Sequence, residues 1–421
     1  MANNSVKDRI SSHYKAIRAF TEEIVRPLEI EDFIIQATAD VSPPKWHMAH
    51  TTWFFERFIL KEFKTDYTEF NPHFDYLFNS YYETIGPFHP RHKRGVLTRP
   101  TVEEVHTYRK YIDENIFELL EYVDDKTLKE INGLLEIGLQ HEQQHQELLL
   151  TDIKYNFSQN PLTPVYAASK ETPQENTPSL FKEFQGGLVE IGHHGEGFSF
   201  DNECPRHKVW LEPYKLATRS VTNGEFLAFM EDGGYEEPKY WLSDGWAAVK
   251  KFGWNSPLYW RKKKKEWTQF TLSGEKLLNL DEPVCHVSFY EADAYARWAG
   301  KRLPTEQEWE HAAEGIIPKG NFAENHYLHP VSTVLEESGP LFKMYGDVWE
   351  WTRSSYSPYP GSKPLEGALG EYNAKFMCNQ VVLRGGSCAT PSSHIRATYR
   401  NFFQPEKRWQ FSGIRLAEDW S

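Results

Sequence analysis

The sequence predicts a two-domain protein, with an all-helical N-terminal domain followed by an α+β domain. A chain of 421 residues exceeds what one hydrophobic core usually supports. Residues 1–157 carry long stretches of helical periodicity, whereas from residue 185 to residue 421 short apolar pieces alternate with Gly, Pro and Asn. Between them, residues 158–184 are polar and rich in proline, which is the composition of a linker.

The N-terminal domain is expected to form four helices joined by loops. Thr101-Val-Glu-Glu104 has the spacing of a capping box, and Ser42-Pro-Pro places proline where the first turn of a helix tolerates it. The four expected helices cover residues 10–24, 46–63, 101–123 and 127–157. The loop 65–99 is rich in Tyr, Phe, His and Arg, so we expect it to be ordered and functional. This pattern indicates an up-and-down four-helix bundle.

The second domain is expected to be an α+β domain with many loops. Short apolar pieces at residues 187–192, 209–211 and 381–387 alternate with Gly, Pro and Asn, which indicates the β part of this domain. Helical segments are predicted near residues 223–230 and 289–299. Loops carried by a rigid scaffold are common places for binding and catalytic residues.

Charge and cysteine usage narrow the possible functions. Lysine and arginine total 47 and the acids total 60, so the formal net charge of −13 argues against nucleic-acid binding. No apolar run approaches the ~20 residues that cross a bilayer, and the N-terminus lacks the basic-then-apolar order of a signal peptide. The four cysteines form no CxxC pair. We therefore expect a cytoplasmic protein without membrane partners.

Two histidine pairs predict a metal site. His141 and His145 are four residues apart on a helix, so both imidazoles project from one face. A second histidine cluster, Trp46-His-Met-Ala-His50, also lies at the start of a helix. The interior of a bundle commonly holds a metal between facing helices, and three imidazoles suit either zinc or non-haem iron. Glu147 points to another side of the helix and is not expected to be a ligand.

Several motifs resemble known families. His141-Glu-Gln-Gln-His-Gln-Glu147 resembles the signature of DinB-like metal-binding four-helix bundles. The second half resembles the formylglycine-generating-enzyme fold, which is C-type-lectin-like. The motifs that carry this second resemblance are Thr218–Glu225, Pro283–Ser288, Arg302–Glu310, Gly346–Trp351, Arg384–Ser387 and Gly413–Leu416. Together they resemble the ergothioneine-pathway sulfoxide synthases, or hercynine oxygenases, which are non-haem iron enzymes that join a thiol to the imidazole of a histidine betaine with O2.

The resemblance implies an Fe(II) site made of His50, His141 and His145. His47 is interpreted as a polar residue at a helix start. Cys388 follows Arg-Gly-Gly-Ser, but no second cysteine lies between it and Ser421, so copper oxidase chemistry is not expected.

The resemblance also assigns residues to the two organic substrates. Gln144 would contact hercynine, and the aromatic faces of Phe402 and Phe403, next to Asn401, would attract its trimethylammonium group; the two rings are equally compatible with plain core packing. Arg91 and Arg94 match an arginine pair that would bind the carboxylate of the thiol.

A proton donor is expected at Tyr81 or Tyr82, in the same loop as the arginines. The identity of the thiol, cysteine or γ-glutamylcysteine, stays open, as does the oligomeric state.

Four other functions remain compatible with the motifs. Ovothiol-type enzymes of the same family act on histidine, and a selenium-using relative shares the architecture. In a zinc DinB-like thiol transferase the metal would activate a thiol for substitution without O2. A non-catalytic binding module would use the same fold for ligand binding alone.

Overall fold

The structure is a computed structural model that describes residues 2–172, 177–333 and 341–420, with side chains from Val6 onward. The chain divides into two compact units. Unit 1 comprises residues 1–162 and 366–372, and unit 2 comprises residues 163–365 and 373–421. The predicted fold class, α followed by α+β, is confirmed. No helix among the described residues combines the length and apolarity needed to cross a membrane.

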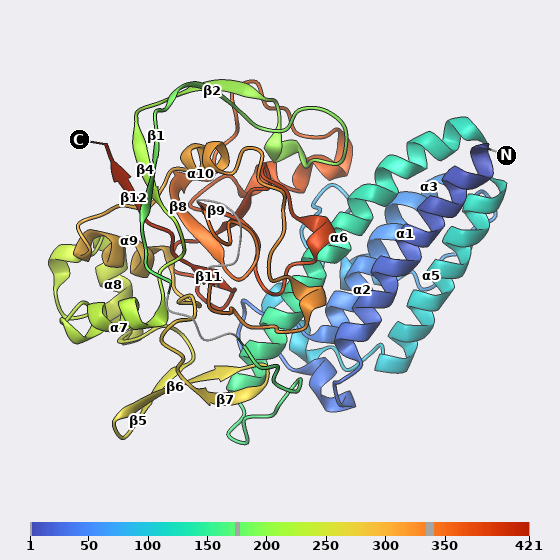
Figure 1. Cartoon of the computed structure of the whole chain (residues 1–421). Coiled ribbons are helices and arrows are strands. Elements are labelled where there is room, and N and C mark those ends of the chain that lie inside the picture. Colours follow the sequence, from blue (N-terminus) through green and yellow to red (C-terminus); the bar gives the residue numbers. More distant parts are fainter. Residues whose placement is uncertain (1, 173–176, 334–340, 421) are drawn as a thin grey trace. The chain divides into compact units, whose positions relative to one another are not determined.

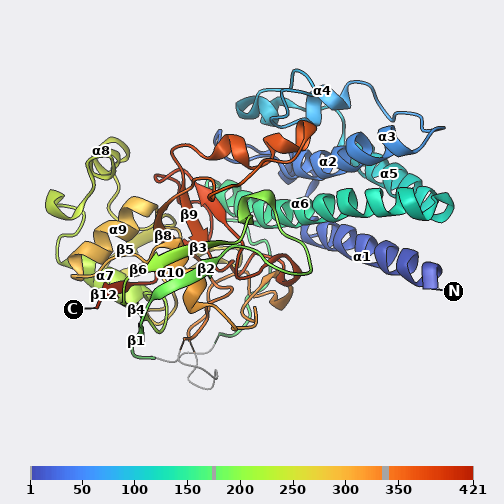
Figure 2. The ribbon, with the colours of Figure 1, turned by 90° about the horizontal axis from the view of Figure 1, so that it is seen from above.

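Unit 1 is a bundle of four long helices. They are α1 (Ala2–Val25), α2 (Pro44–Phe55), α5 (Val102–Tyr122) and α6 (Asp125–Ser158). Figure 1 and Figure 2 show these helices side by side, and α2 packs against both α5 and α6. A π-helical turn, Glu56–Leu60, joins α2 to the short α3 (Lys61–Phe63), so the helix expected over residues 46–63 is continuous but not regular.

Local sequence signals set the helix ends. The Thr101 hydroxyl accepts a hydrogen bond from the Glu104 amide, and the Glu104 carboxylate accepts one from the Thr101 amide, so the predicted capping box is confirmed. The side chain of Asp124 caps α6 by accepting from the Thr127 amide. Pro44 occupies the first turn of α2, where its missing N–H costs nothing.

Glu142, inside the histidine motif, joins three helices of the bundle. Its carboxylate accepts hydrogen bonds from the Arg18 guanidinium at 2.8 Å, the Arg109 guanidinium at 3.0 Å and the Thr21 hydroxyl at 2.6 Å. All four side chains are buried. Burial acts to raise the pKa of Glu142, but the two guanidinium groups outweigh it and hold that pKa below its usual value. This charged cluster anchors α6, which carries the histidine motif, to α1 and α5.

We expect Glu142→Gln to destabilise the protein by about 1–3 kcal/mol, because it removes the fully buried counter-charge that two arginines share. Arg18 keeps its ion pair with Asp113, and Arg109 keeps its ion pair with Glu22. Urea unfolding followed by circular dichroism measures the loss. Glu130→Gln makes the same change at an exposed position of α6, and it should stay within about 0.5 kcal/mol of the wild type. Equal stability of the two variants would contradict a structural role for the Glu142 cluster.

The aromatic loop that precedes α5 is ordered, as expected from its composition. It contains α4 (Phe74–Phe78) and a 3₁₀ helix, Arg91–Val96. The buried carboxylate of Glu56 accepts hydrogen bonds from the hydroxyls of Tyr67 and Tyr108 and from the Phe70 amide. The π-helical turn therefore ties the start of this loop to α5.

Unit 2 combines short sheets with short helices. One sheet has the order β1-β4-β12, and another has the order β10-β9-β8-β11. Two antiparallel ribbons complete the strands, β2-β3 and β5-β6-β7. The strand bounds are β1 Phe181–Phe184, β2 Gly187–Ile191, β3 His207–Leu211, β4 Tyr214–Ala217, β5 Trp260–Lys263, β6 Glu266–Thr271, β7 Gly274–Leu277, β8 Trp349–Ser355, β9 Val381–Arg384, β10 Asn401–Phe403, β11 Ser412–Gly413 and β12 Ala417–Asp419. Strand β1 lies inside the stretch 158–184 that composition assigned to the linker.

The helices of unit 2 are only partly predictable. Helices α7 (Asn223–Glu231) and α9 (Phe289–Trp298) confirm the two predicted segments. Helices α8 (Ser243–Phe252) and α10 (Glu306–Ala312) were not predicted, because segments this short show few periods of an apolar pattern.

Several motif residues of unit 2 form buried ion pairs. Glu306 pairs with Arg384 at 2.8 Å and with Arg400 at 2.8 Å, and Glu350 pairs with Arg415 at 2.8 Å. These side chains are buried, so removal of any one partner would leave an uncompensated charge in the core. Glu306, Arg384, Glu350 and Arg415, which lie in the motifs that carry the family resemblance, therefore have a structural explanation.

Candidate metal centre

Three histidines from two helices meet in the core of unit 1. His50 comes from α2, and His141 and His145 come from α6. Their ligating nitrogen atoms all lie within 4.8 Å of one another, and the Nε2 atoms of His50 and His141 are 3.1 Å apart. The three residues predicted as metal ligands are thus brought together, and Glu147 is outside the cluster.

Burial keeps these imidazoles neutral. It lowers the pKa of His141 to about 3. It also holds the pKa values of His50 and His145 well below their usual value, and the neighbouring histidines add to that effect. A neutral imidazole offers a lone pair to a metal, whereas a protonated one does not. The donor set therefore fits a divalent transition metal with positions left for other ligands.

In two of these three histidines, the Nδ1 atom is hydrogen-bonded. His50 Nδ1 lies 2.6 Å from the carbonyl oxygen of Phe78 and donates to it. His145 Nδ1 lies 2.7 Å from Nδ1 of His47, whose Nε2 lies 2.9 Å from a carboxylate oxygen of Asp152. His47 lies in the first turn of α2, as the interpretation of a polar helix-start residue has it, but its ring is also buried in contact with His145. The His47/His50 spacing on α2 is the sequence signal that was available for it.

An aromatic stack holds His50 in place. Its ring lies between the indoles of Trp46 and Trp53. The ring centroids of His50 and Trp46 are 4.5 Å apart with an interplanar angle of 15°, and those of His50 and Trp53 are 5.7 Å apart with an angle of 16°. The guanidinium carbon of Arg94 lies 3.3 Å from the centroid of the Trp46 ring, on which it stacks. Arg94, predicted to bind the thiol, and His50, predicted to bind the metal, therefore both stack on the indole of Trp46.

The two predicted arginines have different surroundings. Arg94 is 3% exposed and donates to the hydroxyls of Ser42 and Ser80 at 2.9 Å each, while its Nε has no partner among the described residues. Burial, and then the charge of Arg91, lower the pKa of Arg94 well below its usual value. Arg91 is exposed, and its guanidinium donates to the backbone oxygen of Asp40.

The two predicted tyrosines stack on each other with ring centroids 4.6 Å apart. Tyr82 is fully buried, and its hydroxyl makes no hydrogen bond of ordinary geometry with the residues that the structure describes. Burial, and then the neighbouring Tyr81, raise the pKa of Tyr82 well above its usual value. The ring of Tyr82 lies 5.8 Å from that of Trp53, which stacks on His50.

A third tyrosine at this site was not predicted. Tyr372 belongs to the segment 366–372 of unit 1, and its ring centroid lies 5.6 Å from that of His141. Its hydroxyl donates to the side-chain oxygen of Gln144, 228 residues earlier in the chain. Glu371 accepts hydrogen bonds from the amides of Glu83 and Thr84, which ties the segment to the aromatic loop. No local pattern in the sequence indicates this long-range contact.

The predicted hercynine contacts Asn401, Phe402 and Phe403 form β10 in unit 2. The Phe402 ring stacks on Tyr356 with the ring centroids 4.0 Å apart, and the Phe403 ring packs against Trp409 with the centroids 5.4 Å apart. Both rings are half-buried. Their role in substrate binding stays a prediction.

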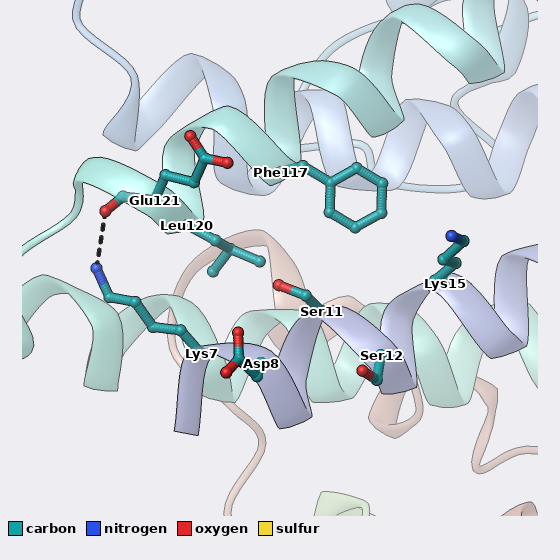
Figure 3. Close-up of a pocket in the computed structure, with 8 residues that line it drawn as sticks. All are labelled: Lys7, Asp8, Ser11, Ser12, Lys15, Phe117, Leu120 and Glu121. Atoms are coloured by element: carbon teal, nitrogen blue, oxygen red, sulfur yellow. Dashed lines mark hydrogen bonds between the residues drawn. The ribbon is translucent and has the colours of Figure 1, made fainter. Parts of the chain in front are cut away.

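A groove of 540 Å³ runs between α1 and α5 (Figure 3). It is lined by Lys7, Asp8, Ser11, Ser12, Lys15, Phe117, Leu120 and Glu121. Lys7 donates across it to the backbone oxygen of Glu121 at 3.1 Å. None of these residues belongs to α2 or α6, so the groove is separate from the histidine cluster.

Comparison with known proteins agrees with this architecture. Residues 166–328 and 317–420 match the family described as the Sulfatase-modifying factor enzyme 1-like domain. The chain is 32% identical to the hercynine oxygenase of Mycobacterium tuberculosis over 306 residues, which covers 67% of this chain and 70% of that protein.

Two further relatives with the same name come from other mycobacteria. The hercynine oxygenase of Mycolicibacterium thermoresistibile is 33% identical over 66% of this chain and 67% of its own length. That of Mycolicibacterium smegmatis is 29% identical over 94% of this chain and 96% of its own length. These matches confirm the resemblance seen in the motifs. The chain therefore belongs to the hercynine oxygenase family of oxidoreductases, the sulfoxide synthases of the ergothioneine pathway.

Proposed function

We propose that this chain is an Fe(II)- and O2-dependent sulfoxide synthase that joins cysteine or γ-glutamylcysteine to the imidazole of hercynine. The observation that carries the proposal is the buried cluster of three neutral imidazoles, His50, His141 and His145. When bound there, Fe(II) would bind O2 and would have coordination positions available for the substrate imidazole and the thiolate. The names of the relatives support hercynine as the acceptor substrate.

Arg94 is proposed to bind the carboxylate of the thiol substrate. A guanidinium remains charged in proteins, and a buried charge is unfavourable unless it is paired. Arg94 donates to two hydroxyls, and the charge of the Asp152 carboxylate also acts on it. A substrate carboxylate would add a direct ionic partner and an acceptor for Nε, which has none among the described residues. Arg91, exposed and near enough to influence the pKa of Arg94, would add to the attraction.

We expect Arg94→Met to raise KM for the thiol by about 10–100-fold, since a hydrogen bond to a charged group contributes about 1.5–3 kcal/mol. The substrate-free protein should also lose some thermal stability, because the variant removes the hydrogen bonds of Arg94 to Ser42 and Ser80. Steady-state kinetics and thermal melts measure the two effects. The exposed Arg99→Met is the matched control. An unchanged KM for the thiol would exclude Arg94 from substrate binding.

Two groups of residues are proposed to bind hercynine. Gln144, which accepts a hydrogen bond from the Tyr372 hydroxyl beside the ring of His141, is proposed to contact the substrate through its side chain. Phe402 and Phe403 are proposed to attract the trimethylammonium group by cation–π interaction, with Asn401 as a neighbouring polar contact.

Tyr82 is proposed to donate the proton. Its hydroxyl is fully buried, and burial together with the neighbouring Tyr81 raises its pKa, so the phenol is protonated at neutral pH. Tyr81 stacks on the ring and restricts its position.

The function is tested by incubating the Fe(II) protein with hercynine, O2 and either thiol, and identifying the product by mass. We expect a sulfoxide of hercynine joined to one of the two thiols, together with O2 uptake. Histidine in place of hercynine, and a selenium donor in place of the thiol, test the two related activities. Zinc in the purified protein and no O2 uptake would overturn the proposal in favour of a thiol transferase.

A further inference from the structure

A buried chain of hydrogen bonds runs behind the metal-binding side of His145. Asp152 and His145 lie on the same face of α6, two turns apart, and His47 of α2 fills the space between them. The Asp152 carboxylate contacts His47 Nε2 at 2.9 Å, and His47 Nδ1 contacts His145 Nδ1 at 2.7 Å. The exposed fractions of His47 and Asp152 are 3% and 2%, so water does not compete for these contacts.

The direction of each hydrogen bond follows from the carboxylate. Asp152 Oδ2 accepts from the backbone amide of Ser42 at 2.8 Å, and it faces His47 Nε2 through the same atom. An ionised carboxylate only accepts, so His47 Nε2 carries the hydrogen. In neutral His47 the other nitrogen, Nδ1, then has a lone pair and accepts from His145. His145 must therefore carry its hydrogen on Nδ1 and its lone pair on Nε2.

We propose that Asp152 and His47 are positioning residues that hold His145 in the Nδ1–H tautomer, with the Nε2 lone pair directed to the metal. The inference rests on the proposed metal centre. A ligating histidine is commonly oriented by a partner on its other nitrogen, and loss of such a partner costs about 10–100-fold in metal affinity.

The three ligands are oriented in different ways. His50 donates from Nδ1 to the backbone carbonyl of Phe78, and the position of that carbonyl depends on the backbone and not on any side chain. His141 Nδ1 is buried with no hydrogen-bond partner among the described residues. His145 depends on two side chains, so its orientation can be changed by substitution without altering the backbone.

Substitutions at His47 separate hydrogen bonding from packing. In His47→Gln the amide oxygen can accept from His145 while the amide N–H donates to Asp152, so both bonds can re-form. His47→Leu removes both bonds and keeps an apolar side chain of similar bulk. Asp152→Asn keeps an acceptor oxygen for Ser42 and His47 but removes the charge. Gln146→Leu is the matched control, because it removes two buried bonds from α6, to Ile17 and Thr21, that touch no histidine.

Two measurements test the proposal on the full-length protein. Long-range ¹H–¹⁵N NMR of the metal-free protein reports the tautomer of each histidine. We expect His145 as Nδ1–H in the wild type, His47→Gln and Asp152→Asn, and a mixture of tautomers in His47→Leu. Competition with a chelator gives the Co(II) dissociation constant, which should rise about 10–100-fold in His47→Leu, less in Asp152→Asn, and stay near the wild-type value in His47→Gln and Gln146→Leu.

The proposal is overturned if His47→Leu keeps the wild-type tautomer and Co(II) affinity. It is also overturned if His47→Gln and Gln146→Leu lose as much affinity as His47→Leu, since packing alone would then explain the loss. If His47→Leu does not fold, the NMR spectra of Asp152→Asn and His47→Gln decide. A His145 that does not carry its hydrogen on Nδ1 in these two variants contradicts the assignment. A wild type that binds Co(II) but makes no sulfoxide would refute the proposed function and leave this inference standing.

Discussion

His141→Ala is expected to leave the protein without bound metal and without sulfoxide synthesis. The three imidazoles are neutral and converge on one point, so removal of one leaves two ligands from separate helices. Since loss of a partner behind a ligand already costs about 10–100-fold in metal affinity, loss of the ligand itself should cost more. Metal analysis after anaerobic loading with Fe(II), together with product assay by mass, measures both effects.

His73→Ala is the control, because it removes an exposed imidazole from the same unit. Circular dichroism should show that both variants retain their helices, since the Glu142 ion pairs and the caps of α6 are untouched. Full metal content and activity in His141→Ala would place the metal, and with it the reaction, somewhere else.

Tyr82→Phe is expected to lower kcat by about 10²–10⁴-fold with the metal content unchanged, which is the usual contribution of a general acid. Tyr372→Phe should instead raise KM for hercynine, because it releases Gln144 from the hydroxyl that orients it. The measurement is steady-state kinetics on Fe(II)-loaded variants, with Tyr76→Phe, which removes an exposed hydroxyl from the same loop, as the control.

The double variant of Tyr82 and Tyr372 shows whether the two hydroxyls act together. Independent roles predict that the two losses in kcat/KM multiply, whereas a shared proton path predicts a smaller combined loss. A large fall in kcat confined to Tyr372→Phe would move the proton-donor role from the aromatic loop to the segment 366–372.

Several residues of the family motifs have structural roles. Glu306, Arg384 and Glu350 lie in predicted motifs of unit 2, and the structure shows them as partners in buried ion pairs. Their presence indicates the fold rather than the chemistry. Glu142, in the middle of the histidine motif, is also structural, since it joins α6 to α1 and α5.

The sequence by itself determined what depends on local geometry. The i, i+4 spacing places His141 and His145 on one face of α6, and the capping box starts α5, because both follow from the 3.6-residue period and the free amides of a helix. Only the tertiary structure decided that His47 supports His145 from 98 residues away and that Tyr372 reaches Gln144 across 228 residues. Those contacts depend on which faces of distant segments pack together, and no short-range pattern specifies that packing.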